Sequence, residues 1–148
     1  MQMHPTRSWS RRIAAAVLAV AAITGISACS SDAPASSPVS SAAGQHMAAN
    51  DFSTAMKAPG TIVLDVRTPA EYASGHLAQA KNIDIEASSF AKQIASLDKN
   101  ATYAVYCHSG NRSGTALEQM TAAGFTHVYD LAGGIGAWQA MGGPMTTG

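Results

Sequence analysis

One short segment of the chain combines a nucleophile, a glycine and a permanent cation: Cys107-His108-Ser109-Gly110-Asn111-Arg112. It follows an apolar run typical of a strand and precedes a helical pattern. A tight loop between a strand and a helix turns backbone N–H groups inwards and can bind an anion, and the helix N-terminus adds about half a positive charge. Gly110 permits a backbone angle that other residues resist, and Arg112 adds a planar donor fork. We therefore expect Cys107 to be a reactive thiolate beside an anion site.

The alternative for Cys107 is a buried structural cysteine at a strand end, which is common for cysteines in general. The presence of Gly110 and Arg112 in the same loop favours the reactive thiol. His108, next to the nucleophile, either assists donor binding as an imidazolium or faces solvent, and the residues leave both possibilities open. Three histidines show no metal-ligand spacing, so no metal site is expected: His76, His108 and His127.

Two charged residues, Asp65 and Arg67, follow the neighbouring predicted strand and could support the same site. They either line the crevice beside Cys107 or form an ion pair that braces the loop, and we favour the ion pair. We predict a structural hydrogen-bonding role for His76 and a position on a solvated helix face for Glu71.

These residues are placed by alternating strand and helix patterns. The predicted strands cover 61–66, 82–85, 102–106 and 126–129. The predicted helices begin near Asn50 or Asp51, at Thr68-Pro69, at Ser88 or Ser89, near Asn111 and after Gly133-Gly134. This alternation predicts an α/β fold, with a central parallel sheet of about five strands and helices on both faces. Ligands of such sheets bind beyond the carboxyl ends of the strands, where Cys107 stands.

The N-terminus has the pattern of a secretory signal peptide, with basic residues in 1–12 and an apolar run over 13–23. That run is shorter than the roughly 20 residues that span a bilayer. Ile26-Ser27-Ala28-Cys29 resembles the lipobox of bacterial lipoproteins, which implies that Cys29 is lipidated and becomes the mature N-terminus. The protein is then anchored to a membrane of the cell envelope, outside the cytoplasm. The alternative is an uncleaved anchor helix with an incidental cysteine.

The chain divides into a signal peptide (1–28), a flexible tether rich in Ser, Ala and Pro (29–45) and one folded domain (46–148). After residue 28 the chain has six basic and nine acidic residues, a formal charge of −3. A mildly acidic domain gives no reason to expect nucleic acid as a partner.

Four segments of the chain resemble motifs of the rhodanese family, in the family's order. They are 64–72 followed by Gly75-His76-Leu77, then 80–83, then the six-residue loop 107–112, then 131–138. The resemblance spans about residues 50–142 and implies a rhodanese-like fold. His108 is a departure, because Arg, Lys or Gln often stands there in active members, and it bears on the choice of sulfur donor.

The resemblance implies a sulfurtransferase. Cys107 would take a sulfane sulfur from thiosulfate or a similar donor, hold it as a persulfide and pass it to cyanide or another thiophilic acceptor. The donor would bind to backbone N–H groups of the loop and to the Arg112 side chain; the loop residues are His108, Ser109, Gly110, Asn111 and Arg112. The resemblance implies no metal or organic cofactor, and we expect a monomer.

Three other functions remain open. Cysteine-dependent phosphatases and arsenate reductases also use a Cys/Arg anion loop, but the phosphatase loop is one residue longer than the spacing from Cys107 to Arg112. A non-catalytic rhodanese-like binding or sensing module is the second, although such modules often lack the cysteine that this chain keeps. A persulfide carrier or thiol-redox protein outside the cytoplasm is the third.

Overall fold

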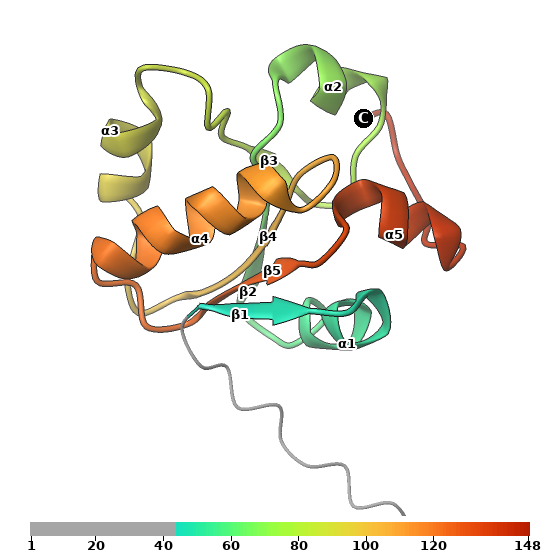
Figure 1. Ribbon diagram of the computed structural model, residues 1–148, viewed down its shortest axis with the longest axis horizontal. Helices are drawn as coiled ribbons and strands as arrows, with labels where there is room; N and C mark the ends of the chain where they lie inside the picture. The colour runs from blue at the N-terminus through green and yellow to red at the C-terminus, as the bar shows by residue number, and fades with distance from the viewer. Residues whose placement is uncertain (1–43) are drawn as a thin grey trace, which may run out of the picture. The chain divides into compact units, whose positions relative to one another are not determined.

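The computed structural model describes residues 44–148, which form an α/β domain (Figure 1). The predicted signal peptide, Cys29 and residues 30–43 of the predicted tether lie outside the described residues. Five strands form one sheet, all of them parallel, in the order β1-β5-β4-β2-β3. The strands are β1 (Gln45–Met47), β2 (Thr61–Asp65), β3 (Lys81–Asn82), β4 (Thr102–Tyr106) and β5 (Val128–Leu131). The helices are α1 (Ala49–Ala55), α2 (Pro69–Ser74), α3 (Phe90–Ala95), α4 (Asn111–Ala122) and α5 (Gly134–Ala140).

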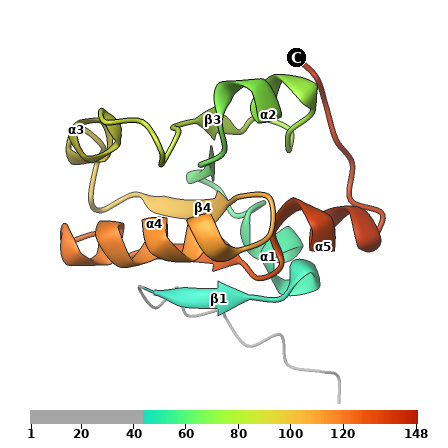
Figure 2. The ribbon, with the colours of Figure 1, turned by 45° about the horizontal axis from the view of Figure 1, so that its top comes forward.

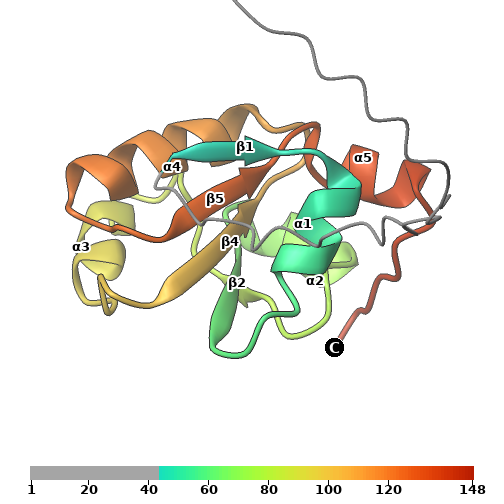
Figure 3. The same ribbon diagram turned by 90° about the horizontal axis from the view of Figure 1, so that it is seen from below.

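Helices cover both faces of the sheet, so the predicted fold class is confirmed. Alternate side chains of each strand point to opposite faces, and the buried residues accordingly form two clusters. On one face Leu64 and Val105 pack with apolar residues of α3 and α4. On the other face Val63 and Ala104 pack with apolar residues of α1 and α5. Figures 1 and 3 show α4 on the opposite side of the sheet from α1 and α5.

Local sequence explains the start of α2. Thr68 caps this helix: its hydroxyl accepts a hydrogen bond from the Glu71 backbone N–H, and the Glu71 carboxylate accepts one from the Thr68 backbone N–H. Pro69 occupies the first turn, where its missing N–H costs nothing, and Gly75 ends the helix as predicted. The prediction for α1 was wrong in detail, because the N-cap is Ala48 and no side chain caps the helix.

The strands differ from the prediction at the edges of the sheet. Gln45–Met47 forms β1, which pairs with β5, although this segment was not predicted as a strand. The predicted boundary between tether and domain therefore falls inside β1. At the other edge, β3 ends at Asn82, earlier than predicted, while the N–H of Ile83 still donates to the carbonyl of Asp65. None of the helices between residues 44 and 148 is long and apolar enough to cross a membrane.

Candidate active site

Cys107 lies directly after β4, at the carboxyl edge of the sheet, and is fully buried. Its Sγ accepts a hydrogen bond from the backbone N–H of Gly110 at 3.1 Å. Gly110 adopts a φ of +97° and is the N-cap of α4, so the sulfur sits at the N-terminus of that helix. Both the N–H contact and the helix dipole favour negative charge on the sulfur. His108 and Ser109 are exposed on the outer part of the loop.

The start of α5 lies next to the loop that follows β4, as Figure 2 shows. The backbone N–H of Ile135 donates to the carbonyl of Cys107 at 2.8 Å, and that of Gly136 to the carbonyl of His108 at 3.3 Å. At Gly134, a Cβ atom would lie 2.6 Å from the Cys107 carbonyl oxygen. Only a residue without a side chain allows this approach. The C-terminal motif thus positions the carbonyl groups of the loop, a role that its sequence alone did not reveal.

A buried carboxylate, Asp130, joins the loop to the edge of the sheet. Its Oδ2 lies 2.7 Å from the hydroxyl of Ser113, which also lies 3.0 Å from the carbonyl of Gly110. Its Oδ1 lies 2.6 Å from Nδ1 of His46 in β1. None of these three residues was predicted as part of the site from the sequence. The available signal was the charged Asp130 within the buried strand β5, because a buried carboxylate needs hydrogen-bond partners.

Arg112 contacts two carboxylates, and these contacts correct the prediction for Glu71. The Arg112 guanidinium donates two hydrogen bonds to the Glu71 carboxylate, at 2.7 and 2.8 Å, and lies 3.5 Å from Glu86. The hydrogen bond from Arg112 lowers the pKa of Glu71 to about 2, and the same bond raises the pKa of Arg112. Glu71 is therefore not part of a merely solvated helix face: it links α2 to the first turn of α4.

Asp65 and Arg67 form the buried ion pair that we favoured. Nη2 of Arg67 donates to Asp65 Oδ2 at 2.6 Å and to the carbonyl of Gly75 at 2.7 Å. The amide of Asn82 donates to the carbonyl groups of both Asp65 and Arg67. The pair thereby fixes the loop between β2 and α2 and the end of α2.

His76 lies beside this pair and makes structural contacts with Tyr72. Its ring stacks on Tyr72 with centroids 3.8 Å apart, and its Nδ1 lies 3.0 Å from the carbonyl of Tyr72. Within residues 44–148, no cluster of three or more His, Cys, Asp or Glu side chains could hold a metal ion.

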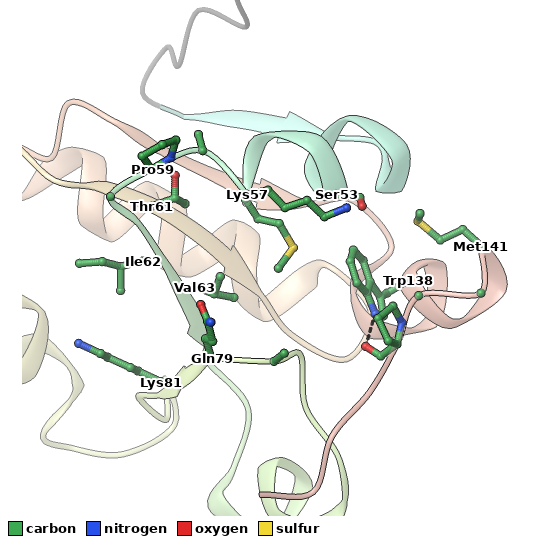
Figure 4. Close-up of a pocket in the computed structure, with 17 residues that line it drawn as sticks. Ser53, Lys57, Pro59, Thr61, Ile62, Val63, Gln79, Lys81, Trp138 and Met141 are labelled. Atoms are coloured by element: carbon green, nitrogen blue, oxygen red, sulfur yellow. Dashed lines mark hydrogen bonds between the residues drawn. The ribbon is translucent and has the colours of Figure 1, made fainter.

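A cavity of about 700 Å³ lies elsewhere, between α1, α5 and the start of β2 (Figure 4). Met56, Val63 and Trp138 are among its lining residues, and none of residues 107–113 contributes to it. Thr61 opens β2 and pairs with Thr102, the first residue of β4, whereas Cys107 follows the last. The cavity therefore lies towards the amino edge of the sheet, away from the thiol.

The chain is similar to proteins of known family in both sequence and fold. The family model described as the rhodanese-like domain matches residues 48–141. The thiosulfate sulfurtransferase GlpE of Pseudomonas entomophila is 36% identical over 86 residues, which cover 58% of this chain and 77% of that protein. GlpE of Pseudomonas aeruginosa is 37% identical over 82 residues, which cover 55% of this chain and 73% of that protein.

Solved structures show the same likeness. A rhodanese-related protein from Thermoplasma volcanium has a TM-score of 0.63 at 34% identity, covering 70% of this chain and 99% of that chain. A rhodanese-like domain protein from Staphylococcus aureus has a TM-score of 0.56 at 26% identity, covering 64% of this chain and 90% of that chain. Because the family match extends from α1 through the Cys107 loop to α5, the chain belongs to the family of rhodanese-like domains.

Proposed function

We propose that the domain is a sulfurtransferase in which Cys107 carries the sulfur as a persulfide. The observation that carries this proposal is the 3.1 Å hydrogen bond from the Gly110 N–H to Cys107 Sγ at the start of α4. A thiolate formed here would accept this N–H bond and face the start of a helix, and the thiolate is the nucleophilic form of cysteine. The likeness to GlpE, which is named a thiosulfate sulfurtransferase, makes thiosulfate the first donor to test.

The proposed reaction has two steps. The Cys107 thiolate attacks the outer sulfur of thiosulfate, the S–S bond of the donor breaks, and sulfite leaves with the bonding electron pair. Cyanide or a thiolate then attacks the outer sulfur of the persulfide, and the Cys107 thiolate leaves. Backbone N–H groups of residues 108–112 bind the donor and stabilise the charge on the terminal sulfur. No step in this sequence uses a metal or an organic cofactor.

The six-residue loop from Cys107 to Arg112 favours sulfur transfer over phosphate hydrolysis. It is one residue shorter than the phosphatase loop, and the Arg112 guanidinium is bound to Glu71. A non-catalytic binding module is the other candidate, and it is opposed by the retained cysteine with its N–H contact from Gly110.

Replacing the thiol tests the proposal. Cys107→Ser should abolish sulfur transfer from thiosulfate to cyanide, because a serine hydroxyl cannot hold sulfur as a persulfide. The variant should unfold at nearly the same temperature as the wild type, since the two side chains are close in size. Thiocyanate formation and thermal unfolding measure the two outcomes. Thiocyanate production at the wild-type rate would refute the role of Cys107.

We also propose that Cys29 is lipidated and that the protein is a monomer held at a membrane outside the cytoplasm. The lipobox-like segment Ile26-Ser27-Ala28-Cys29 and the basic and apolar stretches before it support the lipid anchor. The tether would then separate the membrane from the catalytic domain.

A further inference from the structure

We propose that Glu71 sets the choice of sulfur donor by holding the Arg112 guanidinium away from dianions, so that small organic persulfides are preferred to thiosulfate. This inference rests on the proposed function and concerns the same site. It follows from the contacts that surround Arg112, the cation predicted from the sequence to bind the donor. Arg112 follows Asn111, where α4 begins, and stands two residues after Gly110, whose backbone N–H contacts Cys107 Sγ.

The donor fork of Arg112 is already occupied. Nη1 and Nη2 each donate to a different oxygen of Glu71, at 2.8 and 2.7 Å, and such two-point contacts to carboxylate are among the strongest hydrogen bonds in proteins. The Arg112 side chain is 26% exposed and that of Glu71 is 31% exposed, so solvent screens the pair only in part. A thiosulfate ion that binds end-on, through the same two N–H groups, must displace the carboxylate.

The N-terminal cap of α2 holds the Glu71 carboxylate in this position. Its Oε2 accepts hydrogen bonds from the Thr68 hydroxyl at 2.9 Å and from the Thr68 backbone N–H at 3.1 Å. The carboxylate is therefore held by the cap of α2 as well as by Arg112. With a pKa of about 2 it is ionised at any pH at which a thiolate reacts. It cannot be released from Arg112 by protonation under working conditions.

The charge around Arg112 is also unfavourable to a dianion. Glu86 lies 3.5 Å from Nη1 of Arg112, so one guanidinium faces two carboxylates in the described part of the chain. A thiosulfate ion carries two negative charges and is repelled by such a group, whereas an organic persulfide in its reacting form, R–S–SH, carries no charge on its sulfur atoms. The backbone N–H groups of the loop remain available to either donor.

The chemistry of the preferred donor balances without another reactant. The Cys107 thiolate attacks the outer sulfur of a persulfide R–S–SH, and the S–S bond of the donor breaks. The thiolate R–S⁻ leaves with the bonding pair, and the outer sulfur with its proton stays on Cys107. One S–S bond replaces another, so no external oxidant or reductant is needed.

The test compares two donors with the purified protein: thiosulfate and the persulfide of 2-mercaptoethanol, at about pH 8, above the usual titration range of histidine. Glu71→Gln should lower the KM for thiosulfate and raise its kcat/KM about tenfold, because the Arg112 fork is released. The kcat/KM for the organic persulfide should change less than about twofold, since that donor does not compete for the fork. Glutamine also serves in this type of helix cap, so the variant should fold.

Three further variants sharpen the test. Glu118→Gln removes the same charge from an exposed position of α4 and should leave kcat/KM unchanged for both donors. Glu86→Gln should shift the KM for thiosulfate in the same direction as Glu71→Gln but by less, and it leaves the cap of α2 intact. The rise in kcat/KM for thiosulfate should disappear in the double variant E71Q/R112Q, because the freed Arg112 guanidinium causes it.

An unchanged or raised KM for thiosulfate in both Glu71→Gln and Glu86→Gln would overturn the inference and show that the pair holds Arg112 in its productive position. That result leaves the proposed function standing if Cys107 still gains sulfur. If Cys107 gains sulfur from neither donor in the wild-type protein, the proposed function fails, and the inference fails with it.

Discussion

At the scale of single residues, the thiol of Cys107 depends on glycines that let two backbone segments meet. Gly110 bends the loop so that its N–H reaches the sulfur, and a Cβ atom there would lie 3.0 Å from the backbone nitrogen of Gly133. Gly134 approaches the carbonyl groups of Cys107 and His108 at φ +58°. The conformation of the loop is thus determined by backbone contacts as well as by side chains.

Gly134→Ala tests this dependence. The new methyl group would meet backbone atoms that cannot move without displacing the loop. We therefore expect the free energy of unfolding to fall by about 1–3 kcal/mol from overpacking. Alanine at positive φ should lower it by about 1–2 kcal/mol more. Sulfur transfer should fall with it. Gly142→Ala is the matched control, because Gly142 has a φ of +79° and open space around it. Urea unfolding of both variants measures the difference, and equal losses would refute the close approach at Gly134.

At the scale of elements, the site is assembled where α2, α4 and α5 meet the carboxyl ends of β2 and β4. The alternating patterns in the sequence placed Cys107 and Asp65 at this edge, because parallel strands end together there. They could not show that α2 and α4 are joined, since Glu71 and Arg112 lie 41 residues apart and the surface pattern of one helix carries no information about its neighbour.

The ion pair between Glu71 and Arg112 should make the free energy of unfolding depend on pH in the acid range. The pKa of Glu71 is about 2 in the folded protein and near its ordinary value of 4.5 in the unfolded chain. A depressed folded pKa adds stability that is complete above about pH 4.5 and is lost as the pH falls towards 2. For a partly exposed pair this amounts to about 0.5–1 kcal/mol.

Thermal unfolding between pH 7 and pH 3 measures this contribution. The wild type should be more stable than Glu71→Gln at pH 7, and the difference should shrink at pH 3. Glu118→Gln, which changes an exposed charge on α4, should show no such convergence. A difference between wild type and Glu71→Gln that stays constant with pH would contradict the ionic contact.

At the scale of the whole molecule, sequence patterns predicted the α/β class and the parallel sheet because buried parallel strands are nearly continuous apolar runs that alternate with helical patterns. They missed β1, since Gln45-His46-Met47 has no such run and becomes a strand only by pairing with β5. The link from His46 to Asp130 could not be predicted for the same reason: the sheet brings together residues 84 positions apart.

The anchoring of the molecule is tested through Cys29. If Cys29 carries the proposed lipid, Cys29→Ala should move the protein from the membrane fraction to the soluble fraction of cells, because the binding would come from acyl chains at about 0.8 kcal/mol per buried methylene. Cys107→Ser serves as a control and should stay with the membranes. Membrane association that persists in Cys29→Ala would favour an uncleaved anchor helix.

The most direct test of sulfur carriage is the intact mass of the purified protein after exposure to a sulfur donor. Thiosulfate at high concentration, or the persulfide of 2-mercaptoethanol, should add the mass of one sulfur atom to the wild type, and the addition should map to the peptide containing Cys107. Cyanide should then remove it, and Cys107→Ser should never acquire it. A wild-type protein that gains no sulfur from either donor, or gains it equally in Cys107→Ser, would contradict persulfide chemistry at this loop.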